Sequence, residues 1–209
     1  MATEVDICNM ALAYLGDRAN VTSIDPPEGS AQADHCARFY PIARNQILAE
    51  HSWAFATRRV KLAKVVSAPL KTKNAFALPS DCIRVVSVHD TAAPDDRYVE
   101  NFTIENQNEF TVVTCNCDEI FIKYISHNIS ASTFPPVFSD ALAHLLASKL
   151  AGPLVTGTSG ANLAQEEMKI YEAFLSRAIK QDALQFNEHE VYVNPFVGDL
   201  LQGEKYGAN

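Results

Sequence analysis

The sequence predicts an α+β protein: a helical bundle body with an inserted antiparallel β-sheet and an extended C-terminal arm. Apolar residues recur at helical spacing before residue 52 and again after residue 133, and short β-branched and aromatic runs lie between these regions. Beyond residue 186 the apolar residues have no helical period. We therefore divide the chain into helices 1 and 2 of the body (1–52), a β-rich insertion (53–132), helices 3 and 4 of the body (133–186) and the arm (187–209).

Two amphipathic helices are expected before the insertion. Thr3 and Asp6 can cap the first helix and Gly16 can end it, and its apolar stripe comprises Val5, Cys8, Leu12 and Leu15. The second helix is expected over 30–50, with Pro41 bending or interrupting it. Its apolar side comprises Ala33, Cys36, Ala37, Tyr40, Ala43 and Ile47.

Two further helices are expected after the insertion. The third should present a broad apolar face and end at Gly152-Pro153. That face comprises Phe138, Leu142, Leu145, Leu146 and Leu150. The fourth is expected from about residue 160 to 186, with Leu163, Ile170, Phe174 and Ala178 in the core and Glu166, Glu167, Lys169 and Lys180 outside.

The insertion should form one antiparallel sheet, because its apolar runs are short and separated by turn-prone residues. The expected strands are AFALP, CIRVVSVHD, RYVENFTIE, FTVVT and EIFIKYI. Trp53 and Phe55 alternate where the insertion begins, so we expect them to anchor the sheet to the helices rather than to stack on nucleic-acid bases.

Charge is unevenly distributed along the chain. The net charge is −8, which argues against a conventional nucleic-acid-binding protein. No acidic residue lies between Glu50 and Asp81, and six basic residues in this stretch are therefore expected to form an exposed basic face that contacts DNA or an acidic protein surface. They are Arg58, Arg59, Lys61, Lys64, Lys71 and Lys73.

The sequence contains no recognisable catalytic or metal-binding motif. The five cysteines are scattered among apolar residues, and the Cys115-x-Cys117 pair has no matching ligand pair, so neither a metal nor another cofactor is expected. Glu50 and His51 are adjacent rather than on one helix face, and His144 is expected to be a contact residue rather than a ligand. No run is long and apolar enough for a membrane span, and no secretion signal is evident.

The arm contains many apolar residues that do not follow a helical period. It can fold back on its own subunit or bury these residues on another subunit, and composition leaves both alternatives open. Its candidate contact residues are Val191, Tyr192, Val193, Pro195, Phe196, Val197, Leu200 and Leu201, of which Tyr192 and Phe196 are the preferred anchors.

Four segments occur in a characteristic order: EVDICNMALAYLG, CARFYPIARNQILAEHSWAFATRR, AFALPSDCIRVV and FPPVFSDALAHLLASKLAGPL. Together they resemble the tail tubular protein A-like family of tailed-phage head-to-tail adaptors, also called head-completion or connector proteins. The resemblance covers residues 3 to 186. Its most distinctive part is the run from His51 through Trp53 to Arg58, followed by Leu78-Pro79-x-Asp81 and Arg84.

The resemblance implies a non-enzymatic virion protein, made in the host bacterial cytoplasm and located at the head-tail junction. It implies a dodecameric ring of copies beneath the portal protein, a downstream tail or nozzle protein as a further partner, and genomic DNA passing through the ring without sequence-specific binding. Two other classes remain open. A virion-associated cell-wall hydrolase requires paired acids in a cleft, and a small DNA-binding accessory protein requires salt-dependent affinity.

Overall fold

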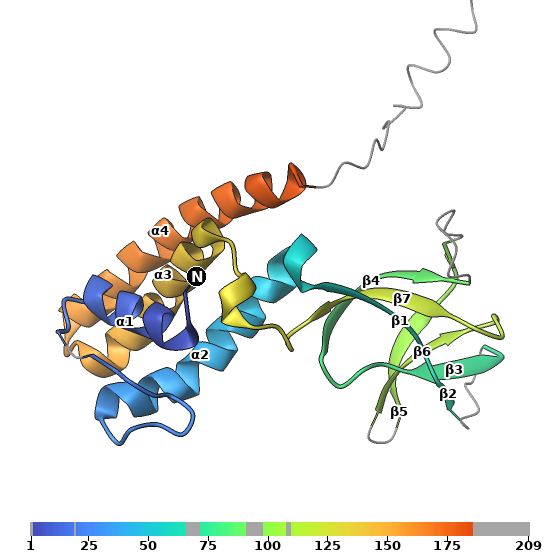
Figure 1. Ribbon diagram of the computed structural model, residues 1–209, viewed down its shortest axis with the longest axis horizontal. Helices are drawn as coiled ribbons and strands as arrows, with labels where there is room; N and C mark the ends of the chain where they lie inside the picture. The colour runs from blue at the N-terminus through green and yellow to red at the C-terminus, as the bar shows by residue number, and fades with distance from the viewer. Residues whose placement is uncertain (1, 19, 66–71, 91–97, 108–109, 186–209) are drawn as a thin grey trace, which may run out of the picture.

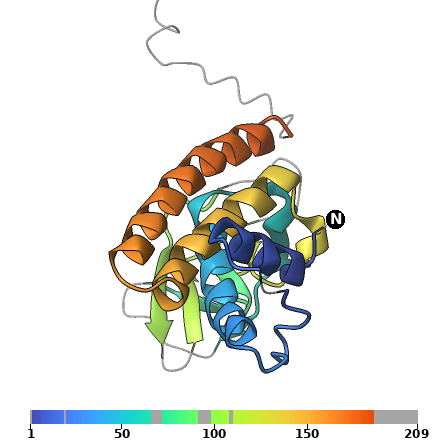
Figure 2. The same ribbon diagram turned by 90° about the vertical axis from the view of Figure 1, so that its left-hand side faces the viewer.

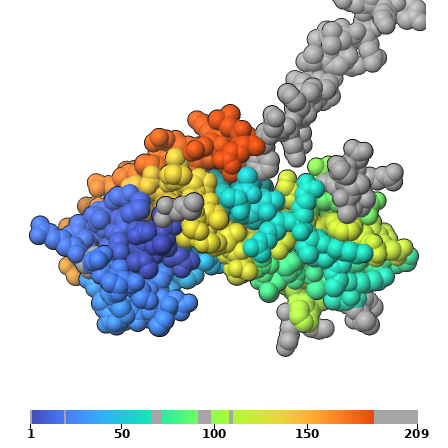
Figure 3. Space-filling model, viewed as in Figure 1, coloured from blue at the N-terminus to red at the C-terminus, as the bar shows by residue number. Residues whose placement is uncertain are grey.

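The computed structural model describes residues 2–18, 20–65, 72–90, 98–107 and 110–185. Within these residues, four α-helices form one lobe, the helical lobe, and seven strands in two antiparallel sheets form the other, the sheet lobe (Figures 1 and 3). The predicted α+β class is confirmed, because strands β1 to β7 lie between the second and third helices. The predicted arm, with its candidate contact residues, lies outside the described residues.

The helical lobe is built around its third helix. Helices α1 (Glu4–Tyr14), α2 (Ala31–Glu50) and α4 (Thr158–Ala183) all pack on α3 (Pro136–Leu154), whose side chains are buried on nearly every side (Figure 2). The predicted apolar face of α3, Phe138, Leu142, Leu145, Leu146 and Leu150, is fully buried. The predicted cap of α1 is confirmed, because Asp6 N donates to Thr3 Oγ1 and Thr3 N donates to Asp6 Oδ2.

Helix α2 is not interrupted at Pro41, contrary to one of the two outcomes that the sequence suggested. The lost backbone hydrogen bond is offset by packing, because Tyr40 and Ala43 are buried on either side of the proline in the same core. Pro41 itself is exposed. Helix α3 likewise continues through Pro153 and ends at Leu154, one residue past the end predicted at Gly152-Pro153.

The core stripe of α4 differs from the prediction. Ile170 is 39% exposed, whereas its neighbour Tyr171 is buried. Glu167, which was expected on the outside, is buried together with Asp182. The buried positions Gly160, Glu167, Tyr171, Ala178 and Asp182 follow a helical period, but two of them carry acids that a hydrophobicity pattern assigns to solvent.

The strands form two sheets rather than the single sheet expected. One has the order β1 (Thr57–Lys61), β7 (Phe121–Ser126), β4 (Cys82–His89), and the other has the order β2 (Lys64–Val65), β3 (Asn74–Ala77), β6 (Phe110–Cys115), β5 (Thr103–Gln107). Of the predicted strand RYVENFTIE, only the last three residues, 103–105, lie in β5, and Tyr98 makes an isolated bridge to His89. A separate apolar core forms in this lobe around Phe76, Val113 and Ile122.

Strand β4 serves both cores because its pairing with β7 is irregular. The register shifts between Cys82 and Arg84 and again between Val85 and Ser87, which inserts Ile83 and Val86 as extra residues. Ile83 and Val86 pack against the core of the helical lobe, whereas Cys82 and Val85 pack against the core of the sheet lobe. The two bulges therefore let one strand bridge both cores.

Trp53 lies where the chain leaves the helical lobe. Residues Ala54–Ala56 form a 3₁₀ turn there, not the strand start that the alternation of Trp53 and Phe55 suggested. The Trp53 side chain is 1% exposed, and its Nε1 donates to the carbonyl of Ile47 at 3.0 Å. Its ring packs edge-on against Phe138, with centroids 4.9 Å apart, and Phe55 joins the same aromatic cluster.

Replacing Trp53 with Ala should lower the free energy of unfolding by about 3–5 kcal/mol, because the large buried ring would leave a cavity. Urea denaturation followed by circular dichroism measures this loss. Ile42→Ala is the control, because Ile42 is 52% exposed on α2 and its truncation should change stability little. A Trp53→Ala variant that unfolds like the parent but loses affinity for single-stranded DNA would contradict this structural role.

Candidate functional site

Two segments that are distant in the sequence meet at the junction of the lobes. Residues 51–58 end α2 and begin β1, and residues 78–84 connect β3 to β4. Arg84 Nη2 donates to Ser52 Oγ at 3.0 Å, and Arg58 Nη1 lies 3.4 Å from Asp81 Oδ2. The junction therefore joins the entry into the sheet lobe to the start of its longest strand.

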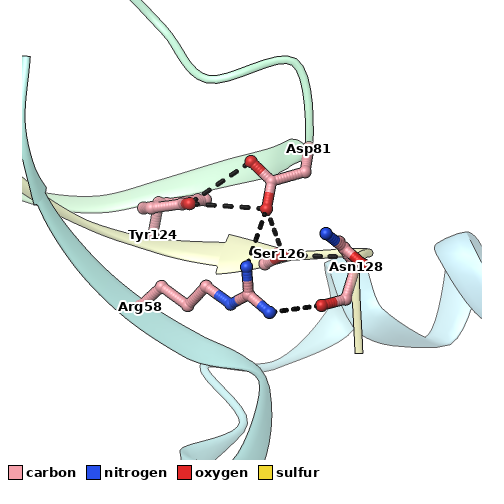
Figure 4. A network of polar contacts seen from close by, with 5 residues as sticks. All are labelled: Arg58, Asp81, Tyr124, Ser126 and Asn128. Atoms are coloured by element: carbon pink, nitrogen blue, oxygen red, sulfur yellow. Dashed lines mark hydrogen bonds and ion pairs between the residues drawn. The ribbon is translucent and has the colours of Figure 1, made fainter. Parts of the chain in front are cut away.

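Asp81 is the centre of this polar network (Figure 4). Its Oδ2 accepts from Ser126 Oγ at 2.6 Å, and its Oδ1 accepts from the Tyr124 hydroxyl at 3.3 Å. Arg58 uses its second terminal nitrogen to donate to the carbonyl of Asn128, whose own N–H donates to Ser126 Oγ. Asp81 directly precedes β4, so its carboxylate links the start of β4 to β1 and β7.

The environment of Asp81 favours its ionised form. Burial alone would raise the pKa of this carboxyl, but the donors Ser126 and Tyr124, together with the charge of Arg58, outweigh burial and hold the pKa below its usual range. The pKa of the neighbouring Tyr124 phenol shifts in the opposite direction, because burial and the Asp81 charge both raise it. The network therefore keeps a carboxylate and a neutral phenol in contact.

A second carboxylate, that of Asp182, reaches the junction from the end of α4. Both of its oxygens accept from the Ala54 N–H at 3.1 Å, so Asp182 caps the 3₁₀ turn after Trp53. His51 Nε2 lies 3.3 Å from Asp182 Oδ2. Burial raises the pKa of Asp182 above its ordinary value, although the Ala54 hydrogen bond and His51 partly offset this effect.

A third polar pair lies inside the helical lobe. His144 Nδ1 and Glu167 Oε2 are 2.7 Å apart, and both residues are buried. Tyr14 stacks on the His144 ring with centroids 4.2 Å apart, and Phe174 lies on it at 5.1 Å. Aromatic rings thus enclose the imidazole, which indicates a packing role between α1, α3 and α4.

The residues of the predicted basic face that the structure describes are exposed, but three of them have acidic partners. Arg58, Lys61 and Lys73 pair with Asp81, Glu119 and Asp118. The contact role expected for this face stays a prediction. These acids lie in the β3–β4 connection and in the turn before β7, outside the acid-free stretch from which the basic face was predicted. Arg59 and Lys64 are exposed, and Lys71 lies outside the described residues.

A groove of about 770 Å³ lies on the sheet lobe between the start of β4 and the β5–β6 hairpin. Its wall is mostly apolar, and it includes Leu78, Val85, Ile104 and Phe110. Arg84 contributes the single charged side chain to that wall among the described residues. The groove lacks the convergent polar groups of a catalytic cleft.

No metal centre is evident in the described ranges, where no three His, Cys, Asp or Glu residues are placed to hold an ion. Cys8 and Cys36 are buried close to each other, and Cys36 and burial together raise the pKa of the Cys8 thiol. Nor does any helix in these ranges meet the length and hydropathy needed to cross a membrane.

Sequence reasoning missed most of the junction network. The sequence marks Asp81 and Arg84 only as motif residues and not as part of a site. The partners Ser126, Tyr124 and Asn128 lie more than 40 residues from Asp81 in the sequence, so no local pattern links them. Asp182 carried a usable signal, because it follows Ala178 by four residues on the apolar stripe of α4. Glu167 precedes Tyr171 by four residues in the same way.

No protein-family model matches the chain, and no curated protein matches it. Among solved structures, the chain is similar to one in the neck of an empty GTA particle, computed with C6 symmetry. The two share 14% sequence identity over 77% of this chain and 87% of that one, with a TM-score of 0.29. A likeness at this level does not assign a function.

Asp81→Asn should lower the free energy of unfolding by about 1–3 kcal/mol, because hydrogen bonds to a charged acceptor are replaced by weaker ones and Arg58 loses its partner. Chemical denaturation at pH 7 measures the loss. Asp118→Asn is the control, because its ion pair with Lys73 is exposed and its removal should leave stability close to that of the parent.

The Asp81 difference should also depend on pH. The pKa of Asp81 in the folded protein lies below its ordinary value of 3.8, so the carboxylate stabilises the fold fully above pH 3.8 and stops doing so as pH falls through the folded pKa. The curves of the parent and Asp81→Asn should therefore converge in acid. A constant difference at all pH values would show that the charge of Asp81 is not responsible.

Asp182→Asn should remove a pH dependence of opposite sign. The pKa of Asp182 in the folded protein lies above its ordinary value of 3.8. Between pH 3.8 and the folded pKa the native state therefore binds more protons than the unfolded state, and stability falls as pH rises. The variant keeps an acceptor for Ala54 and lacks this component. Denaturation at a series of pH values from 3 upward tests this, with Asp34→Asn on the exposed face of α2 as the control.

Proposed function

We propose that the protein is a structural virion protein, a head-to-tail adaptor that forms a ring beneath the portal and links the DNA-filled capsid to the tail. One observation carries the proposal. The two most distinctive segments of the sequence resemblance, 51–58 and 78–84, contact each other at the junction of the lobes through Arg58–Asp81 and Arg84–Ser52. The residues that suggest the family therefore form one structural unit in this chain.

The two lobes suit a protein that must contact different neighbours. Each lobe has its own apolar core, and the lobes are joined by the Arg84–Ser52 hydrogen bond and by the packing of Ile83 and Val86 on the helical core. Copies of the protein in the ring, the portal protein and a downstream tail protein are the proposed partners. The 187–209 arm is proposed to reach the portal or a neighbouring copy.

The charges agree with a channel that lets DNA slide. The chain carries a net charge of −8, and three residues of its basic stretch are paired with acids of the sheet lobe. A lumen that offers few free cations to phosphates binds DNA weakly. We therefore propose that genomic DNA passes through the ring without being held, at the head-tail junction of the virion.

The polar pairs support a structural rather than an enzymatic role. His144–Glu167 and His51–Asp182 resemble acid–base pairs in composition, but both carboxylates are buried and serve packing or capping contacts. We propose no cofactor, and a cell-wall hydrolase activity would need a cleft that presents two carboxylates to a sugar chain.

The isolated protein should sediment largely as a monomer and should form a ring when mixed with its portal protein. Electron microscopy and sedimentation of the mixture test this.

A chain truncated after Asn187 should melt close to the parent, since both described cores lie before residue 186, and should fail to attach to the portal. Failure of the full chain to bind the portal, or release of cell-wall fragments by the protein, would overturn the proposed function.

A further inference from the structure

The groove on the sheet lobe is lined by large apolar side chains that are exposed to solvent. Phe110 is 61% exposed and Ile104 is 48% exposed, and both line the groove together with Leu78, Pro79 and Val85. Clustered apolar side chains of this size on one concave surface indicate a site that is covered by another segment. The described residues do not supply that cover.

We propose that the groove is covered by the C-terminal segment of the same chain, residues 191–201, in the free subunit. Tyr192 and Phe196 are the side chains that enter it. The inference does not rest on the proposed adaptor role, because it concerns the isolated protein.

The end of α4 places this segment within reach of the groove. Asp182, in the last turn of α4, accepts from Ala54 N at 3.1 Å. Ser52, which precedes Ala54 by two residues, accepts from Arg84 of the groove wall at 3.0 Å. An extended chain advances by about 3.3 Å per residue, so Tyr192 and Phe196 reach roughly 23 Å and 36 Å beyond Gln185. Residues 52–54 therefore lie between the end of α4 and the groove wall at Arg84.

The composition of the segment matches that of the groove. Residues 191–201 carry eight apolar residues, and Glu188, Glu190 and Asp199 flank or interrupt them. The groove wall is mostly apolar, with the hydroxyl residues Ser80 and Thr111 and one charged residue, Arg84. Burial of the aromatic side chains supplies the main driving force, and the acids of the segment are attracted to the guanidinium on the wall.

Contact through side chains fits the groove better than addition of a regular strand. The start of β4 forms one wall, and within the described residues no second strand pairs with Cys82 to Ser87. The register shifts at Ile83 and Val86 make this edge irregular, and such bulges disfavour pairing with another strand. The apolar wall at Phe110 and Ile104 is therefore the proposed contact.

Hydrogen–deuterium exchange on the full chain tests the proposal. The amides of residues 191–197 should exchange at least about tenfold more slowly than those of an unstructured chain, because the docked segment is ordered. Phe110→Asp should return them to the unstructured rate. Ile42→Asp is the matched control, because Ile42 is similarly exposed but lies on α2, and it should leave the slow exchange intact.

A reciprocal variant guards against an indirect effect of Phe110→Asp on folding. Tyr192→Asp leaves every residue of the two described cores unchanged, and it should speed exchange of the groove amides of Ile104 and Thr111. Unstructured exchange rates for 191–197 in the parent would overturn the proposal, as would slow exchange that persists in Phe110→Asp. Slow exchange that disappears on dilution would also overturn it, because the segment would then come from a second copy.

Discussion

The exit of the chain from the helical lobe, fixed by the buried ring of Trp53, is the constraint on which the arrangement of the two lobes depends. The indole fills the space beside Phe138 and donates to the end of α2, so α2 ends in one orientation. Asp182 then holds the next turn through Ala54. Because α4 supplies Asp182 and α3 supplies Phe138, three helices determine the direction in which β1 begins.

The sheet lobe can be inserted between two helices because its two ends are neighbours. Strand β1 enters the lobe and strand β7 leaves it, and they pair antiparallel with Thr57 opposite Ile125. Arg58 reinforces this closure by contacting both Asp81 and the carbonyl of Asn128 beyond β7. An insertion whose ends are adjacent leaves the packing of the interrupted bundle intact. The register shifts of β4 then bring Ile83 and Val86 onto the helical core, so the inserted lobe is also packed against the bundle.

The sequence predicts well those features that depend on local periodicity. The apolar stripes of α2 and α3 and the Thr3–Asp6 cap follow from spacing alone, because the large side chains that these two helices bury are mostly apolar. Prediction fails where a distant segment changes the environment of a residue. Glu167 is buried because His144 supplies a partner from α3, and the division of the strands into two sheets depends on pairings between strands far apart in the chain. The junction network was missed for the same reason, since Asp81 meets Ser126 only after β4 and β7 have paired.

The charge asymmetry of the sequence shows how folding changes the meaning of a local pattern. Residues 51–80 contain no acid, and in isolation they indicate a surface that binds phosphates or acidic proteins. In the folded chain Glu119 and Asp118 lie opposite Lys61 and Lys73, and Asp81 lies opposite Arg58. These pairs are partly exposed and add little stability, but together they offset three of the six positive charges that a phosphate would meet. With these pairs and a net charge of −8, the folded chain attracts a polyanion less strongly than the basic stretch alone suggests.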